Sequence, residues 1–246
     1  MGIRQNIKHL RRYRQIVHVL MQHGLGYLIQ RAGLAKLITL SGRQAFTPCE
    51  REPDYCLAGK LRLALMDLGP TFVKLGQLAS TRPDLLPPAY IEELEHLQDK
   101  VQPFPYAQVI EQLVKEIGHP DDIFAEFNQE PLAAASIGQV HEARLKTGEK
   151  VIVKIQRPNI EAQVENDLEI LLGLAKLIEN RVPEARQIGL VAVIEDFAKL
   201  LRRELDYDRE SRNTERVRHS FAEDERIVIP QVYWDYTTPR VLTEEF

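Results

Sequence analysis

One lysine at the end of an apolar stretch has the setting of a phosphate-binding side chain. Lys154 closes the run Val151–Lys154, and the turn Lys146–Glu149 joins this run to an earlier alternating one. Protein kinases place a lysine in this way, after a strand, a loop of small residues and a second strand, so that it meets the nucleotide phosphates. The alternative is a lysine at a sheet edge, whose stem covers apolar surface while its amine reaches water.

The loop that precedes this hairpin consists of small side chains. Ala133, Ala134 and Ala135 come first, and Ser136 and Gly138 follow. Phosphate-binding loops usually contain glycine, because backbone N–H groups must approach the phosphates closely and alanine restricts positive φ. We therefore expect a stiff loop that folds less readily over phosphates. A packing turn between two strands would explain the alanines equally well.

Carboxylates that could hold this lysine occur in the acidic segment Leu200–Glu210. In kinases a helix glutamate orients the strand lysine. Asp206 and Glu210 share a helical face, whereas in a straight helix Glu204 points about 120° away from Glu210. We predict an ion pair between Lys154 and Glu210, which leaves Glu204 for a second cation. A solvated helix with many charge pairs is the alternative.

The second cation is predicted on a helix that begins near Pro70, since proline suits the first helical position. Lys74 and Gln77 lie three residues apart on one face of that helix. Gly76 lies beside them and permits close approach of a neighbouring backbone. On its own, this segment would be interpreted as an amphipathic surface helix.

The elements that must position these residues follow from apolar periodicity and from helix-breaking glycine and proline. Helices are predicted where apolar residues recur at spacings of three and four, and strands where runs alternate or are β-branched. The predicted helices are Gly2–Leu40 (one or two, with a break at Gly24 and Gly26), Leu57–Leu78, Pro88–Val101, Tyr106–Ile117, Ile160–Asn180 and Leu190–Phe221. The predicted strands are Ile123–Phe127, Ile137–Leu145, Val151–Gln156, Ile227–Ile229, Val232–Trp234 and Val241–Phe246, and Ser41–Pro53 is predicted to be a loose link.

Charge is distributed unevenly along the chain. The first 47 residues contain eight Lys or Arg and no Asp or Glu, so the remainder carries 24 basic and all 36 acidic side chains. A basic head with an apolar stripe predicts an amphipathic helix on an anionic membrane surface or on isoprenoid lipid. The stripe could instead pack onto the chain's own core. Nucleic acid is disfavoured as a partner, because no stacking platform or known motif accompanies the arginines.

The composition is that of an ordinary globular protein, since 44% hydrophobic and 28% charged residues argue against disorder. Cys49 and Cys56 cannot form a structural zinc site by themselves, so no metal site is predicted. A reducing cytoplasm is the expected compartment. No stretch approaches the roughly 18 apolar residues of a membrane span. Any attachment would be peripheral, on the inner face of the membrane.

Four motifs in this order resemble the UbiB/AarF family of atypical protein-kinase-like proteins. The resemblance covers about Leu57 to Phe246 and is specific, because the motifs agree in both order and spacing. Lys74-Leu75-Gly76-Gln77 is similar to the family's KxGQ motif, Pro131–Val140 to its alanine-rich loop, Lys154 to its strand lysine, Glu204-Leu205-Asp206 to its ExD motif, and Glu210 to its helix glutamate.

The resemblance implies an α+β fold. A kinase-like small lobe, a short antiparallel sheet with helices, is expected over residues 123–246. A helical KxGQ extension over residues 48–122 and the basic head over residues 1–47 would precede it. The resemblance further implies that Lys74 meets Glu204 and Asp206 at the nucleotide site. It implies ATP or ADP with magnesium as ligands of the full-length family, which acts as ATPases or small-molecule kinases linked to ubiquinone or other isoprenoid lipid metabolism.

The sequence departs from the family's pattern after its last predicted strand. It contains no Asp-Phe-Gly and no catalytic loop with His and Asn, the segments that hold metal and act on substrate in kinases. We therefore expect no complete catalytic set, weak or no nucleotide binding, and dependence on a missing second lobe or a partner chain. A shortened product or a piece of a longer protein would explain this. The alternative function is a non-catalytic scaffold module that binds lipid or a partner through the helical extension.

Overall fold

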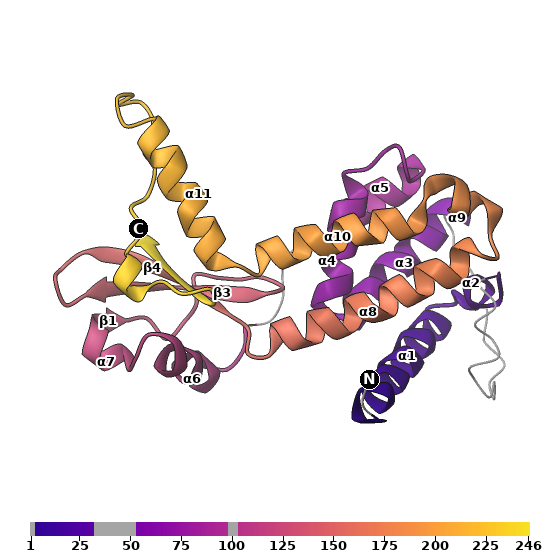
Figure 1. Ribbon diagram of the computed structural model, residues 1–246, viewed down its shortest axis with the longest axis horizontal. Coiled ribbons are helices and arrows are strands. Elements are labelled where there is room, and N and C mark those ends of the chain that lie inside the picture. The colour runs from indigo at the N-terminus through magenta and orange to yellow at the C-terminus, as the bar shows by residue number, and fades with distance from the viewer. Residues whose placement is uncertain (1–2, 32–52, 98–102) are drawn as a thin grey trace. The chain divides into compact units, whose positions relative to one another are not determined.

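The computed structural model describes residues 3–31, 53–97 and 103–246 (Figure 1). The predicted link Ser41–Pro53 therefore lies outside the described residues, apart from its last residue. The chain divides into two compact units, and each unit is built from two separate stretches of the chain. Two of the boundaries between the units fall inside helices. Unit 1 comprises Met1–Gln98 and Ala162–Lys199, and unit 2 comprises Asp99–Glu161 and Leu200–Phe246. The contiguous ranges expected from the sequence, 1–47, 48–122 and 123–246, stay predictions.

The elements alternate between a helical part and a mixed part. The helices are α1 (Ile3–Gln22), α2 (Gly26–Arg31), α3 (Pro53–Leu68), α4 (Pro70–Ser80), α5 (Pro88–Glu95), α6 (Tyr106–Glu116), α7 (Pro120–Ile123), α8 (Ile160–Glu179), α9 (Pro183–Ile188), α10 (Leu190–Glu204) and α11 (Tyr207–Ser220). The strands are β1 (Phe124–Phe127), β2 (Ala133–Ala134), β3 (Gly138–Leu145), β4 (Lys150–Gln156) and β5 (Val241–Glu245), with a 3-10 turn at Trp234–Tyr236.

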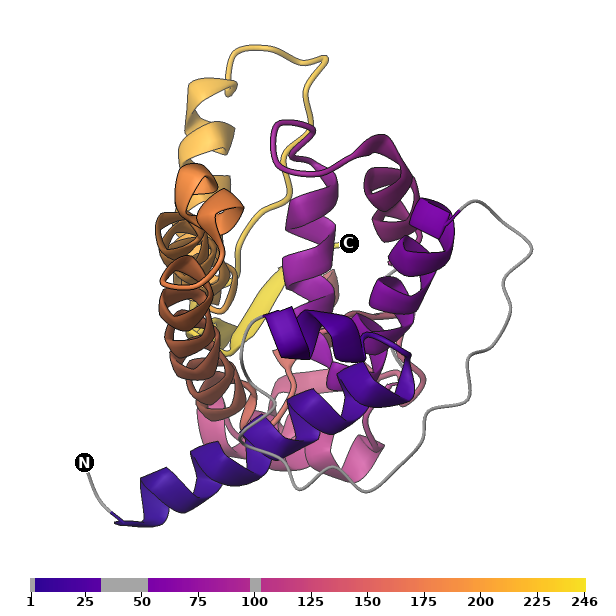
Figure 2. The same ribbon diagram turned by 90° about the vertical axis from the view of Figure 1, so that its right-hand side faces the viewer.

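Unit 1 is helical, and α3, α4 and α5 pack against one another within it (Figure 2). Apolar side chains of the basic head form part of the core of this unit. Val17 of α1 and Ile29 of α2 are buried and pack with Leu174 and Leu177 of α8. The described part of the stripe thus packs onto the chain's own core, the arrangement that the sequence left open beside lipid contact.

Unit 2 contains an antiparallel sheet in the order β1–β3–β4–β5, with β2 paired to β3 (Figure 1). The turn between β3 and β4 contains Gly148 at φ 109°, a conformation that favours glycine. One face of the sheet carries an apolar core, which includes Val151, Val153 and Ile155 of β4 and is covered by α6. The opposite face of β4 therefore carries Lys154, because side chains alternate along a strand.

The structure confirms α6, the β3–β4 hairpin and the break between α1 and α2, where Gly24 adopts φ 74°. The predicted start of a helix near Pro70 is also confirmed, since α4 begins there, and Gly69, whose φ of 97° is not helical, separates it from α3 within the predicted helical block Leu57–Leu78. Two sequence expectations are wrong. The predicted helix Leu190–Phe221 is two helices, since α10 ends at Glu204 and α11 begins at Tyr207.

The second error concerns the segment before β5. Ile227–Ile229 forms no strand, and Val232–Trp234 contributes only an isolated bridge between Val232 and Glu244 before the 3-10 turn. These residues are β-branched, but a strand needs a partner with matching register, which a propensity does not supply. The strand β2, the helices α7 and α9 and the 3-10 turn were not predicted.

Candidate nucleotide-binding site

Strand β4 places Lys154 on the sheet face opposite the apolar core. Lys154 is paired across the sheet with Val140 of β3 and with Leu242 of β5. Leu242 packs on this side with Tyr207 of α11 and Val232. The lysine stem therefore lies in an apolar setting, and its ammonium group needs charged partners nearby.

Two carboxylates supply those partners. The Lys154 ammonium donates to Glu210 Oε1 at 2.8 Å and lies 2.9 Å from Glu244 Oε1. The predicted pairing with Glu210 is confirmed and joins strand β4 to helix α11. The contact with Glu244 of β5 was not predicted, because it depends on the register between β4 and β5.

The two carboxylates also decide the charge state of the lysine. Burial alone lowers the pKa of Lys154, and the hydrogen bonds to Glu210 and Glu244 outweigh this effect, so the pKa lies above its ordinary value. The group is therefore a cation at neutral pH. A permanent cation in a half-buried setting can bind an anionic ligand.

The alanine-rich loop lies at the end of the same sheet. Ala133 and Ala134 form β2 and pair with β3, and the Ala135 N–H donates to the Gly138 carbonyl at 2.8 Å. Ser136 is fully buried, and among the residues that the structure describes its hydroxyl has no hydrogen-bond partner. Much of the loop is thus committed to sheet pairing.

Gly138 has a packing reason to be glycine. A Cβ atom there would lie 2.6 Å from the Ile155 carbonyl oxygen and 2.7 Å from the Tyr207 hydroxyl, closer than real Cβ contacts. The space at Gly138 is therefore filled by the protein itself and is no cradle for phosphate. Burial, and then the charge of Glu210, raises the pKa of Tyr207, so its hydroxyl stays neutral beside the glycine.

The ExD residues lie where α10 gives way to α11. Glu204 is the last residue of α10, and Asp206 is the N-cap of α11, its carboxylate accepting from the Arg209 N–H at 3.1 Å. Because the helix is broken between Glu204 and Glu210, these two side chains are not separated by the 120° expected for a straight helix. Asp206 has the helix-capping role that aspartate commonly takes.

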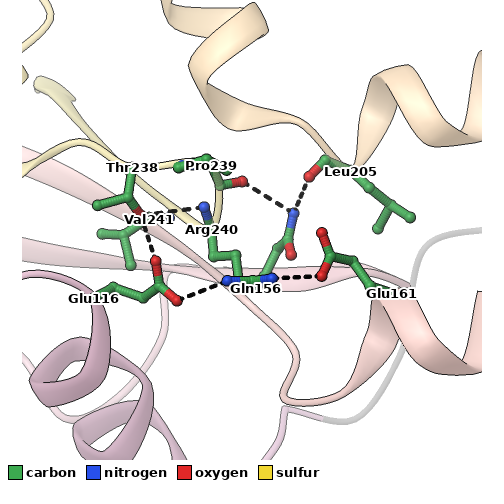
Figure 3. A network of polar contacts seen from close by, with 8 residues as sticks. All are labelled: Glu116, Gln156, Glu161, Leu205, Thr238, Pro239, Arg240 and Val241. Atoms are coloured by element: carbon green, nitrogen blue, oxygen red, sulfur yellow. Dashed lines mark hydrogen bonds and ion pairs between the residues drawn. The ribbon is translucent and has the colours of Figure 1, made fainter.

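Gln156 holds this break in place, two residues beyond Lys154 on the same face of β4. Its amide nitrogen donates to the carbonyls of Leu205 and Pro239 (Figure 3). The Tyr207 N–H also donates to the Pro239 carbonyl, at 3.1 Å. The first turn of α11 is thereby fixed to the sheet, which positions Glu210 over Lys154.

Arg240 joins the segment before β5 to two helices, as Figure 3 shows. Its guanidinium donates to Glu116 of α6 at 3.1 Å and to Glu161 of α8 at 2.6 Å. Glu116 also accepts from the Thr238 hydroxyl at 3.0 Å. These contacts anchor the turn that leads into β5, and so they hold the strand that carries Glu244.

The KxGQ residues lie on α4, in unit 1. A Cβ at Gly76 would lie 2.2 Å from Leu97 and 2.9 Å from Leu65, so this glycine permits close helix packing. The Gln77 amide donates to the Leu97 carbonyl at 2.8 Å. Lys74 is half-buried. The expectation that Lys74 meets Glu204 and Asp206 stays a prediction, since those residues belong to unit 2.

Among residues 3–31, 53–97 and 103–246, no three His, Cys, Asp or Glu side chains are grouped so that they could hold a metal ion. No helix there is both long enough and apolar enough to cross a membrane.

Comparison with known proteins identifies similar sequences and a similar structure. Residues 96–246 match the ABC1 atypical kinase-like domain. The chain is 45% identical over 196 residues to "Probable protein kinase UbiB" of Pseudomonas paraeruginosa (strain DSM 24068 / PA7), covering 79% of this chain and 37% of that protein. It is 37% identical over 238 residues to the protein of the same name from Aliivibrio fischeri (strain ATCC 700601 / ES114), covering 96% and 44%.

A solved structure, the complex of Rv3197 with erythromycin from Mycobacterium tuberculosis, is similar in fold. The TM-score is 0.50 at 29% sequence identity, and the match covers 70% of this chain and 43% of that one. This chain therefore spans less than half the length of the relatives described here.

Proposed function

Because the chain belongs to the ABC1 atypical kinase-like family, we propose that it forms the nucleotide-binding lobe of a UbiB-like kinase or ATPase. The whole protein would act in ubiquinone or other isoprenoid lipid metabolism. The second lobe or a partner chain would supply the residues that hold magnesium and carry out catalysis. ATP or ADP with magnesium is the proposed ligand.

The observation that carries this proposal is the ion pair between Lys154 and Glu210. It joins strand β4, an inner strand of the sheet, to helix α11 later in the chain, beside a loop of small residues, and kinases hold nucleotide phosphates with a strand lysine paired to a helix glutamate. The lysine is a cation whose ammonium has three donors, and among the described residues it contacts two acceptors. Lys154 would hold phosphate oxygens.

The loop supports the proposal less strongly than the lysine does. Other protein atoms pack closely against Gly138, and Ala133 and Ala134 pair with β3. Few backbone N–H groups would then be available to the phosphates, and the chain contains no Asp-Phe-Gly. Nucleotide binding by this chain should therefore be weak, and it should produce no turnover.

Titration calorimetry with ATP and magnesium tests this proposal. We expect weak binding that Lys154→Ala reduces by about tenfold or more, because a charge-assisted contact to phosphate is lost. Lys150→Ala is the matched control, since Lys150 also lies on β4 and pairs with a carboxylate, Glu142, at 2.8 Å. Equal losses in both variants, or no binding by the unaltered chain, would contradict the proposal. A phosphate-release assay that detects steady, Lys154-dependent hydrolysis would contradict the absence of turnover.

A second proposal concerns the basic head. The exposed side chains Arg11 and Arg14 of α1 support binding to an anionic membrane surface, and the exposed Leu10 lies beside them. Each basic residue near such a surface contributes about 1 kcal/mol. Because Val17 and Ile29 pack in unit 1, we propose attraction by charge rather than insertion of the apolar stripe.

A further inference from the structure

The two carboxylates around Lys154 differ in their exposure to solvent. The Glu244 side chain is 9% exposed, whereas that of Glu210 is 44% exposed. A buried ion pair is screened less by water than an exposed one at the same distance. The charge of Glu244 therefore acts on the ammonium with little screening. The hydrogen bond to Glu210 nevertheless makes the larger of the two contributions that raise the pKa of Lys154, and kinases place only the helix glutamate in this role.

Sheet geometry holds Glu244 at this position. Leu242 is the direct partner of Lys154, and Glu244 opposes Ile152, so Glu244 is the diagonal neighbour of Lys154 on one face of the sheet. Its backbone is fixed on the other side by the bridge to Val232. The carboxylate thus lies against the lysine without any movement of α11.

The local charge balance opposes an incoming anion. One ammonium lies between two carboxylates at 2.8 Å and 2.9 Å, which leaves a net charge of −1 around Lys154. A phosphate oxygen that seeks the same ammonium must displace one carboxylate or accept its repulsion. Glu210 orients the lysine from the helix, so Glu244 is the carboxylate that a phosphate would replace.

We propose that Glu244 competes with phosphate for Lys154 and thereby lowers the affinity of this site for nucleotide. This inference rests on the proposed function and assigns an affinity-determining residue to the same site. Removing the charge of Glu244 while keeping its shape should strengthen phosphate binding. Removing the charge of another acid on the same sheet face should leave binding unchanged.

Protection of Lys154 from acylation tests the inference in the 246-residue chain. An N-hydroxysuccinimide ester labels the lysine, and mass spectrometry of the Lys154 peptide gives the labelling rate with increasing ATP, tripolyphosphate or adenosine. The variants are Glu244→Gln and the control Glu142→Gln, which removes the same charge from the pair with Lys150. Each protein is normalised to its own rate without ligand, and circular dichroism verifies that it is folded.

We expect Glu244→Gln to lower the half-protecting concentration of ATP and of tripolyphosphate by about tenfold, the factor that corresponds to ~1.4 kcal/mol. The half-protecting concentrations measured for Glu142→Gln should stay within about twofold of those for the unaltered chain, because the Glu142 carboxylate pairs with Lys150 and not with Lys154. Adenosine should protect none of the proteins. Half-protecting concentrations that are unchanged or higher in Glu244→Gln would overturn the inference.

The same data separate this inference from the proposed function. If ATP protects the unaltered chain but Glu244→Gln gives no gain, the inference fails and nucleotide binding stands. If Glu244→Gln gains protection equally from tripolyphosphate and ATP while ATP does not protect the unaltered chain, competition stands and the proposed nucleotide function fails. If no ligand protects any of the proteins, both are overturned.

Discussion

An ion pair in unit 1, Arg12–Asp167, and the ion pairs of Lys154 in unit 2 differ in how a buried carboxylate is neutralised. In unit 1 the guanidinium of Arg12 donates two hydrogen bonds to the Asp167 carboxylate, at 2.6 Å and 2.8 Å, and a third to the Leu68 carbonyl at 2.7 Å. The Asp167 side chain is 0% exposed. In unit 2 the Lys154 side chain is 25% exposed and lies between a buried and a half-exposed carboxylate.

The difference teaches how to distinguish a structural ion pair from a ligand site. A planar guanidinium satisfies a carboxylate with a rigid fork, and such a pair is closed to other anions. A lysine ammonium is a point charge with three donors, and here it is reachable by solvent and carries an excess of carboxylate around it. The first arrangement contributes stability, whereas the second can exchange one partner for a ligand. The following predictions, from the largest effect to the smallest, test that distinction.

The largest expected effect is loss of stability in Arg12→Met. The substitution keeps much of the side-chain volume but leaves the Asp167 carboxylate buried without its cation. Breaking a buried pair in this way costs about 3–5 kcal/mol. The free energy of unfolding from urea titration checks this, with Arg11→Met on the exposed side of α1 as the control. A loss no larger than that of the control would mean that Arg12–Asp167 is not a structural pair.

Lys154→Met should destabilise less, by about 1–2 kcal/mol, because only one of its two carboxylates is buried and the other is screened by water. Adding Glu244→Gln to Lys154→Met should recover part of that loss, since the buried charge is removed as well. Urea unfolding of both variants checks this. If the double variant is less stable than Lys154→Met, Glu244 has an additional partner that stabilises it.

A smaller effect concerns His141, in the sheet core that backs the site. Its Nδ1 donates to the Asn128 carbonyl, and its Nε2 accepts from the Gln139 amide. Burial lowers the pKa of His141 below 6.5 in the folded chain. The unfolded chain therefore binds more protons, so this contribution to stability is present above 6.5 and is lost as pH falls through the folded pKa.

Thermal unfolding between about pH 7.5 and about pH 5.5 measures this linkage. The unaltered chain should lose more stability on acidification than His141→Gln, which cannot take up that proton. Parallel pH profiles for the two proteins would show that His141 is not held neutral in the fold.

The smallest effect on folding is expected for the double variant Arg11→Gln with Arg14→Gln. Both side chains are exposed, so the free energy of unfolding should change by less than about 0.5 kcal/mol. Flotation with anionic liposomes should nevertheless weaken, by about 1 kcal/mol for each charge removed, and high salt should mimic the loss. Equal flotation of the variant and the unaltered chain, or equal flotation with neutral lipid, would contradict the membrane proposal.

Most of the fold follows from local sequence signals. The hairpin between β3 and β4 was predictable because a glycine turn separates two β-branched or alternating runs. The break between α10 and α11 was not, because Leu205 is apolar and continues the periodicity. One signal there could have been used, since Asp206 is a preferred N-cap residue.

The candidate site was predictable only where sequence order sets the geometry. Lys154 and Glu210 follow from a strand and a later helix, and their pairing is confirmed. Glu244 reaches Lys154 through the register of β5 on β4, which depends on tertiary pairing and on the turn that Arg240 anchors. No periodicity encodes that register.

A crystal structure of the chain with a non-hydrolysable ATP analogue and magnesium tests the central claim most directly. The account predicts a phosphate oxygen within about 3 Å of the Lys154 ammonium, with Glu210 still in contact and the Glu244 carboxylate moved away from the lysine. A nucleotide bound elsewhere, with Lys154 still held by both Glu210 and Glu244, would contradict it.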